Sequence, residues 1–208
     1  MKFTGNQPQR WGVLPLNRES PAFHCARYLQ ENNHFVCTVF SPAPVWSSNR
    51  TTANIGEYVK PNWFQLEPKT YFPLKARFPF QGNLAWNGGE IFTQPRAGEL
   101  IREAGFTRCN GLVVEHWSLV PIIRAFQPER MIVLLSNYNL PTKSAPLVVQ
   151  NRFHEVLEDA DEVWLQRGIE RKLSLKVLAS VFEIFDFNDF TDPDDLWRRM
   201  LQKGQVSL

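Results

Sequence analysis

The chain has 208 residues, of which 43% are hydrophobic, and its 23 basic and 21 acidic side chains give a formal net charge of +2. A chain of this size can bury one sizeable core, and its balanced charge gives no general attraction to nucleic acid or anionic membranes. No apolar run approaches the ~20 residues that cross a bilayer, and the polar start lacks a signal-peptide pattern. We therefore expect a cytoplasmic protein without membrane insertion, whose three widely spaced cysteines stay reduced.

The first region, residues 1–94, is rich in aromatic residues and prolines. Ser20-Pro21 is typical of a helix start and predicts a helix to about Glu31. The β-branched and aromatic residues of 34–41 predict a strand. Four prolines within 58–80 predict short, interrupted edge strands, and Asn87-Gly88 predicts a hairpin turn.

The second region, residues 95–208, alternates between apolar strands and helices. This alternation predicts a mixed α/β fold with parallel strands and right-handed crossovers, in a single domain over 1–208. The predicted strands cover 112–115, 131–136 and 163–165. The predicted helices cover 95–104, 118–126, a segment starting at 144, 171–185, and a last segment that Asp192-Pro193 caps and that runs through Leu201.

Polar residues end two of the predicted strands, namely Glu115-His116 and Ser136-Asn137. If these strands are neighbours, the four side chains converge where open α/β sheets bind ligands. Acid–base chemistry would then use His116, with Glu115 as its orienting partner. Polar residues also end buried strands that carry no chemistry, so these two residues are candidates and not an assigned catalytic set.

Metal, phosphate and thiol chemistry find little support in the sequence. His154 with Glu155 or Glu158 supplies too few ligands for a tetrahedral zinc site. Neither GxxxxGK[ST] nor GxGxxG is present. Cys109 is expected to be a surface thiol, and the other two cysteines to be small core residues. We therefore expect no metal, no cofactor and no complete catalytic set, which favours a protein that is not an enzyme.

The segment 182–195 alternates phenylalanines with acidic residues. Aromatic side chains rimmed by carboxylates suit contact with a basic protein partner, although the same phenylalanines could fasten the last helix to the core. Trp46, in a polar loop, is a second candidate anchor. The candidate partner-binding residues are Phe182, Phe185, Asp186, Phe187, Asp189, Phe190 and Trp46.

A weaker alternative is a single-stranded nucleic-acid binder, because basic and aromatic residues are interleaved within 69–80. The prolines of this segment interrupt strand geometry, which favours aromatics packed in the core. The residues concerned are Lys69, Lys75 and Arg77 with Tyr71, Phe72, Phe78 and Phe80.

Two stretches, 74–86 (LKARFPFQGNLAW) and 111–126 (GLVVEHWSLVPIIRAF), carry a whole-chain resemblance to plasmid-encoded fertility-inhibition factors. These are small cytoplasmic proteins that block conjugative transfer of a co-resident plasmid. The resemblance implies a protein partner, the coupling ATPase that feeds DNA to a type IV secretion channel. The first functional hypothesis is therefore a non-enzymatic inhibitor that binds another protein.

A second resemblance is confined to residues 154–164 (HEVLEDADEVW). This stretch is similar to the helix-then-strand segment of many nucleotide-sugar glycosyltransferases. In those enzymes a donor-binding half follows, whereas about 40 residues follow here and a complete domain takes ~100. The alternative hypothesis is thus a nucleotide- or sugar-nucleotide-binding enzyme, as a glycosyltransferase-like fragment.

Overall fold

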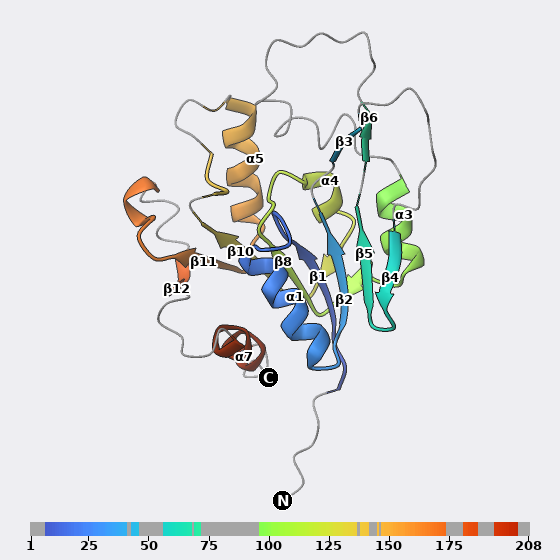
Figure 1. Ribbon diagram of the computed structural model, residues 1–208. Coiled ribbons are helices and arrows are strands. Elements are labelled where there is room, and N and C mark those ends of the chain that lie inside the picture. The colour runs from blue at the N-terminus through green and yellow to red at the C-terminus, as the bar shows by residue number, and fades with distance from the viewer. Residues whose placement is uncertain are drawn as a thin grey trace, which may run out of the picture.

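The computed structural model describes residues 7–40, 43–45, 56–67, 69–71, 96–136, 138–141, 145, 147–173, 181–186 and 194–203 (Figure 1). Its helices are α1 (Pro21–Glu31), α3 (Arg96–Glu103), α4 (Val120–Ile123), α5 (Leu147–Glu158), α7 (Asp194–Lys203) and the 3-10 turn η1 (Glu170–Lys172). The strands of the main sheet are β1 (Arg10–Leu14), β2 (Phe35–Val39), β4 (Gly56–Lys60), β5 (Trp63–Leu66), β8 (Gly111–Val114), β10 (Met131–Leu135), β11 (Glu162–Gln166) and β12 (Val181–Phe185). Short strands form two small pairs, β3 (Ala43–Val45) with β6 (Lys69–Tyr71) and β7 (Arg108–Cys109) with β9 (Gln127–Pro128).

The main sheet has the strand order β12-β11-β10-β8-β1-β2-β5-β4. All neighbours run parallel except β4, which pairs antiparallel with β5. From β1 the chain first moves outward through β2 to β5, and then returns to the other side of β1 with β8 and continues to β12. The direction of winding therefore reverses between β1 and β8, which is the switch point of a doubly wound sheet.

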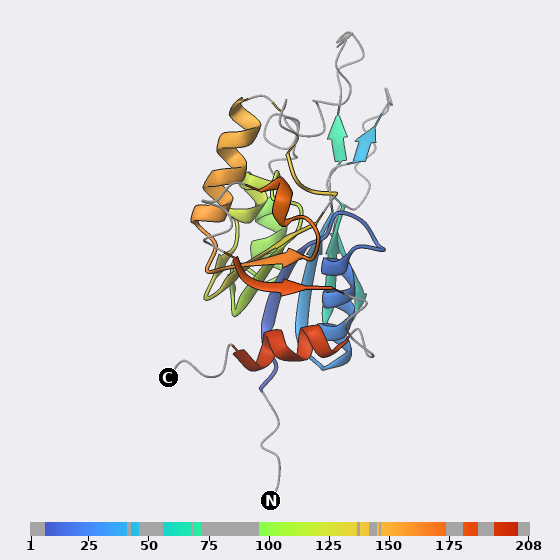
Figure 2. The ribbon, with the colours of Figure 1, turned by 90° about the vertical axis from the view of Figure 1, so that its left-hand side faces the viewer.

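Helices cover both faces of this sheet (Figures 1 and 2). Helices α1 and α7 pack on one face, where Cys25 of α1 lies 4.0 Å from Met200 of α7 between their sulfur atoms. Helices α3, α4 and α5 pack on the other face. The central strands β8 and β10 are buried on both sides, which explains their near-continuous apolar sequences.

The prediction of a mixed α/β fold is confirmed, including the alternation of parallel strands and helices in the second region. Helix α1, strand β2 and the last helix lie where their sequence signals placed them. Helix α4 is shorter than the predicted 118–126. Strands of residues 1–94 and of residues 95–208 join in one sheet, with β1 of the first region lying beside β8 of the second.

Strand β1 is absent from the predictions, because its five residues mix Arg10 and Gly12 with three apolar side chains. Its position depends on a glycine of the neighbouring strand. A Cβ on Gly111 would lie 2.1 Å from Cζ3 of Trp11, so the indole ring can cross β8 only where no side chain stands. This close approach helps to pack the first strand of the chain against the centre of the sheet.

The prediction of one helix over 171–185 is wrong at both ends. The chain forms the turn η1 at its start and the strand β12 at its end, and residues 174–180 lie outside the described part. Strand β12 is rich in β-branched and aromatic residues, and pairing with β11 satisfies its backbone groups. Tertiary pairing thus overrides the helical spacing of the apolar residues.

The expectation of a surface thiol at Cys109 is also wrong. The side chain is 4% exposed, and burial raises its pKa to about 11, so the thiol stays protonated at neutral pH. The prediction that Cys25 and Cys37 are core residues is confirmed, since both are fully buried. The predicted hairpin turn at Asn87-Gly88 lies outside the described residues.

Within the described residues, no helix is long and apolar enough to cross a membrane.

Candidate functional site

The carboxyl ends of β1, β8 and β10 meet at the switch point of the sheet. Strand β8 pairs with β1 on one side and with β10 on the other, as the hypothesis for Glu115 and Ser136 requires. Ligands of doubly wound sheets bind outside these strand ends. The polar residues that gather here, called the strand-end cluster, are Glu115, His116, Ser118, Ser136 and Asn139.

Asn139 holds the cluster together. Its fully buried side chain donates from Nδ2 to the carbonyl oxygens of Glu115 (2.8 Å) and Leu134 (2.6 Å). Its Oδ1 accepts a hydrogen bond of 2.7 Å from the backbone N–H of Ser136. This one side-chain amide, the Asn139 clamp, therefore joins the ends of β8 and β10 and fixes their relative position.

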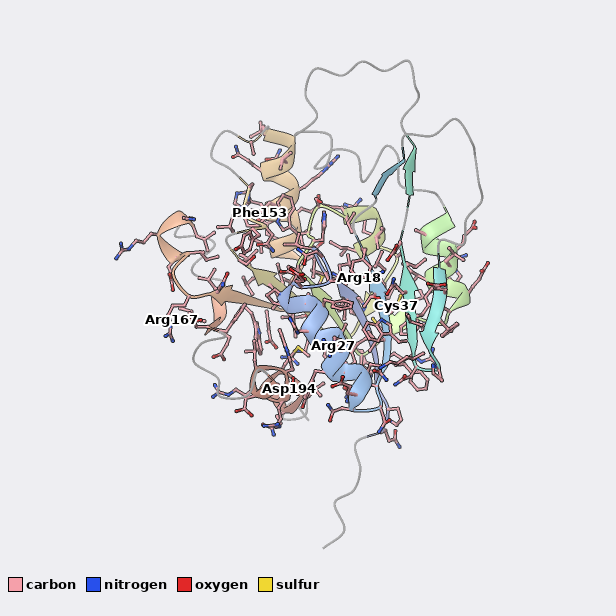
Figure 3. The ribbon with its side chains drawn as sticks, in the orientation of Figure 1. Arg18, Arg27, Cys37, Phe153, Arg167 and Asp194 are labelled. Atoms are coloured by element: carbon pink, nitrogen blue, oxygen red, sulfur yellow. The ribbon has the colours of Figure 1, made fainter. Side chains whose placement is uncertain are left out.

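Trp117 forms an apolar support next to this clamp. Its indole N–H donates to the carbonyl oxygen of Asn139, and its ring meets that of Phe153 edge-on, with 5.0 Å between the ring centroids. Phe153 belongs to α5 (Figure 3). Both rings are buried, so their packing holds the segment between β8 and α4 in place.

His116 lies at the end of β8 with a hydroxyl partner. Its Nδ1 is 2.8 Å from Oγ of Ser118, and Ser118 is buried. Burial of the imidazole lowers the pKa of His116 to about 4, so the ring is neutral at pH 7. A neutral imidazole whose Nδ1 is engaged has Nε2 left for one hydrogen bond to a ligand.

Glu115 points to a different place from the one expected. Its Oε2 accepts a hydrogen bond of 3.3 Å from the N–H of Leu16, and the carboxyl group also bonds to Ser20 and Ala22 at the start of α1. Burial raises the pKa of Glu115, and these hydrogen bonds oppose the rise. The predicted role of Glu115 as orienting partner of His116 is therefore wrong, because Ser118 takes that position.

The loop between β1 and α1 carries an exposed ion pair at the rim of the site. Nη2 of Arg18 lies 2.6 Å from Oε1 of Glu67, which also accepts a bond of 2.7 Å from Nε2 of Gln65. The guanidinium of Arg18 lies over the ring of Phe40, 5.6 Å from its centroid. The pair links the loop before α1 to the end of β5.

Tyr138 is the most exposed aromatic side chain among the described residues, at 83%. It follows β10 in the same turn as the clamp residue Asn139, and its N–H lies 3.4 Å from Oγ of Ser136. Asn137, which the sequence hypothesis included, lies outside the described residues. An exposed ring at this edge offers an apolar surface to a ligand.

The segment predicted to bind a partner is described only in part. Phe185 is 2% exposed and packs in the core with α7, so burial removes it from any contact surface. Asp186 is partly buried. Phe182 belongs to β12, but nothing is described of its side chain, and Phe187, Asp189, Phe190 and Trp46 lie outside the described residues.

Metal and nucleic-acid sites gain no residue from the structure. In the described part of the chain, no group of three or more His, Cys, Asp and Glu side chains could hold a metal ion. Of the basic and aromatic segment 69–80, only the backbone of β6 is described, and Lys75, Arg77, Phe72, Phe78 and Phe80 lie outside.

Sequence reasoning found the two strand ends but missed the residue that joins them. Asn139 lies two residues beyond the predicted strand end Ser136-Asn137 and had no predicted role, although asparagine in a turn is a usual partner for backbone groups. Arg18 and Glu67 carry no sequence signal, because they are 49 residues apart and meet only through the fold.

Comparison with known proteins gives a fold and no family. No family model and no curated protein matches the chain. A chain of sucrose-phosphate synthase from Thermosynechococcus elongatus has a similar structure, with a TM-score of 0.57 and 9% identity over 96% of this chain and 98% of that chain. A second chain of the synthase from the same organism matches with a TM-score of 0.52 and 10% identity, over 86% of this chain and 48% of that one.

These similarities establish a Rossmann-like fold. The chain spans about half the length of the longer synthase chain. They contradict the first functional hypothesis, a non-enzymatic inhibitor that binds another protein, because the similar structures belong to a synthase. The resemblance to fertility-inhibition factors gains no match and stays a prediction.

Proposed function

We propose that this chain is a glycosyltransferase-like domain that binds a sugar-containing substrate at the strand-end cluster. The observation that carries the proposal is the similarity to a sucrose-phosphate synthase chain over 96% of this chain and 98% of that one. The alignment thus covers almost all of both chains. The polar cluster lies at the position of this fold where ligands bind.

The chemistry of the cluster suits a sugar. His116 is neutral at pH 7 and partly buried, so Nε2 of its ring can donate to or accept from a sugar hydroxyl, while the buried Ser118 engages its Nδ1. The exposed ring of Tyr138 offers an apolar face for the C–H side of a sugar ring. Because the imidazole is a weak base at a pKa of about 4, we assign His116 to binding and positioning and not to proton transfer at neutral pH.

The segment that resembles nucleotide-sugar glycosyltransferases fits the same proposal. Residues 154–164 form the end of α5 and the start of β11, which is the helix-then-strand arrangement that the resemblance implies. In those enzymes a donor-binding half follows this segment. Since this chain corresponds to 48% of the longer synthase chain, we propose that the nucleotide is held by a second unit and that this chain binds the sugar side. We place this activity in the cytoplasm, in keeping with three buried, unpaired cysteines.

The test measures thermal unfolding and calorimetric binding with uncharged sugars (glucose, maltose) and sugar nucleotides (UDP-glucose, GDP-mannose). A ligand of the folded state raises the midpoint of unfolding. For the ligand that does so, His116→Ala should weaken binding about tenfold, because one hydrogen bond to the ligand is lost. His24→Ala changes an exposed histidine of α1 and should leave binding unchanged. The proposal fails if no ligand of the panel shifts the midpoint, or if both variants weaken binding equally.

A further inference from the structure

We infer that Ser118 holds the imidazole of His116 in one neutral form, with its proton on Nε2, so that the site offers its ligand a hydrogen-bond donor. Ser118 is then a positioning residue. The ligand atom that meets the imidazole is an acceptor, such as a hydroxyl or ring oxygen of a sugar. This assignment rests on the proposed sugar-binding function and narrows it, because a neutral imidazole by itself can carry its proton on either nitrogen.

The first observation is that the hydroxyl group of Ser118 has a single acceptor. Its Oγ lies 2.8 Å from Nδ1 of His116, and Ser118 is 2% exposed, so water does not replace this partner. Among the described residues, the side chain of Ser118 forms no other hydrogen bond. A buried hydroxyl needs an acceptor for its hydrogen atom, and only an unprotonated Nδ1 provides one here.

The opposite form of the ring would leave this hydroxyl without an acceptor. A proton on Nδ1 would be donated to Oγ of Ser118 or to the backbone of His116 itself, whose hydrogen bond to the charged ring opposes the lowering of its pKa. The carbonyl oxygen of His116 already accepts the N–H of Leu119 at 3.3 Å, so it does not depend on the imidazole. Loss of the only acceptor of a buried hydroxyl disfavours this form by about tenfold in population.

The second observation is that Nε2 is left for a ligand. No hydrogen bond of this atom is present within the described part of the chain, and His116 is only partly buried. The residue follows β8 at the carboxyl edge of the sheet, where ligands of this fold bind. An Nε2 that carries the proton donates and has no lone pair with which to accept. A ligand therefore meets it with the lone pair of an oxygen atom.

Two other histidines supply references within the same chain. Nδ1 of His34 accepts the backbone N–H of Gln9 at 3.1 Å, and a backbone N–H is a donor only, so the neutral ring of His34 carries its proton on Nε2. His24 is exposed on α1, and no hydrogen bond to another described residue fixes its proton. Its neutral ring therefore exchanges between both forms. We expect His116 to resemble His34 and to differ from His24.

The experiment records the ring nitrogen signals of the full chain by NMR, with isotope-labelled histidine, at about pH 8, where exposed histidines are neutral. The variant His116→Asn assigns the signals of His116 by removing them. In the wild type we expect an unprotonated Nδ1 and a protonated Nε2, with nitrogen shifts like those of His34. Ser118→Ala should move both shifts toward the averaged values of His24, because Nδ1 loses its donor.

Ser136→Ala is the matched control for these spectra. It removes a hydroxyl of the same cluster that contacts a backbone N–H and, among the described residues, no imidazole, so the signals of His116 should stay unchanged. For the sugar of the panel that binds, Ser118→Ala should weaken binding about twofold, the loss expected if both ring forms become equally populated. Unchanged binding in this variant, with its ring signals shifted, would refute the donor role of Nε2 toward the ligand.

Two further results would overturn the assignment. One is an averaged or reversed proton position in the wild type, which is measured even if Ser118→Ala does not fold. The other is an unchanged spectrum of His116 in Ser118→Ala. These spectra need no ligand, so the position of the proton and the proposed sugar binding can fail separately.

Discussion

The two ends of the parallel strands use polar residues in different ways. At the amino ends, Arg130 bonds to Glu162 through Nε at 2.6 Å and to the carbonyl oxygen of Met200 at 2.8 Å, which fastens the end of α7 to the sheet. Glu162 also accepts the indole N–H of Trp164 at 2.7 Å. At the carboxyl ends, His116 uses one ring nitrogen within the protein. The amino ends therefore use their polar groups within the fold, whereas the carboxyl ends carry the cluster for which we propose a ligand.

The largest expected effect comes from breaking the ion pair between Arg130 and Glu162 at the amino ends of the strands. Arg130→Ala should lower the free energy of unfolding by about 3–5 kcal/mol, because Glu162, whose side chain is only 11% exposed, is left as a largely desolvated charge without its partner. Urea denaturation followed by fluorescence measures this change. Arg124→Ala is the matched control, since its ion pair with Glu155 is exposed and should contribute about 0–1 kcal/mol. Equal losses in the two variants would contradict the structural role of Arg130.

A somewhat smaller effect is expected at the clamp of the carboxyl ends. Asn139→Ala should lower the free energy of unfolding by about 3 kcal/mol, because the N–H of Ser136 and two carbonyl oxygens lose their buried partner. It should also weaken the binding of any ligand that contacts His116, since the end of β8 is no longer hydrogen-bonded to β10 through Asn139. Asn151→Ala, on the exposed side of α5, should change neither quantity. Wild-type stability in Asn139→Ala would show that the clamp is dispensable.

A third expected effect is a dependence of stability on pH. Burial lowers the pKa of His116 from 6.5 in the unfolded chain to about 4, so the unfolded chain binds more protons between these values. The contribution of His116 to stability is then present above about pH 6.5 and is lost as the pH falls to about 4. His34, whose pKa is also lowered by burial, acts in the same direction, and Glu115, whose pKa is raised, acts in the opposite one.

Comparing variants isolates the histidine from these other groups. Stability of His116→Asn should fall less steeply between pH 6.5 and pH 4 than that of the wild type, as measured by chemical denaturation at each pH. His24→Asn, on the exposed side of α1, serves as the control. Parallel curves for the wild type and His116→Asn would mean that the ring is not desolvated in the folded protein.

Local sequence signals were reliable where one element could be recognised by itself. The proline after Ser20 marked the start of α1, and the continuous apolar run 131–135 marked β10. The signals failed where pairing with another segment decided the result. Strand β12 had helical spacing, and β1 had a weak pattern of its own, yet each pairs with a neighbouring strand that supplies hydrogen-bond partners.

The sequence by itself determined that this protein is mixed α/β and that Glu115-His116 and Ser136 end buried strands. Only the tertiary structure decided that these strands are neighbours at a switch point, that Asn139 ties them together, and that the carboxyl group of Glu115 lies at the start of α1. The physical reason is the range of the interactions. Periodicity and turn residues report on neighbours along the chain, whereas Glu115 meets Leu16 across 99 positions. Such contacts form only when the sheet has brought the strand ends together.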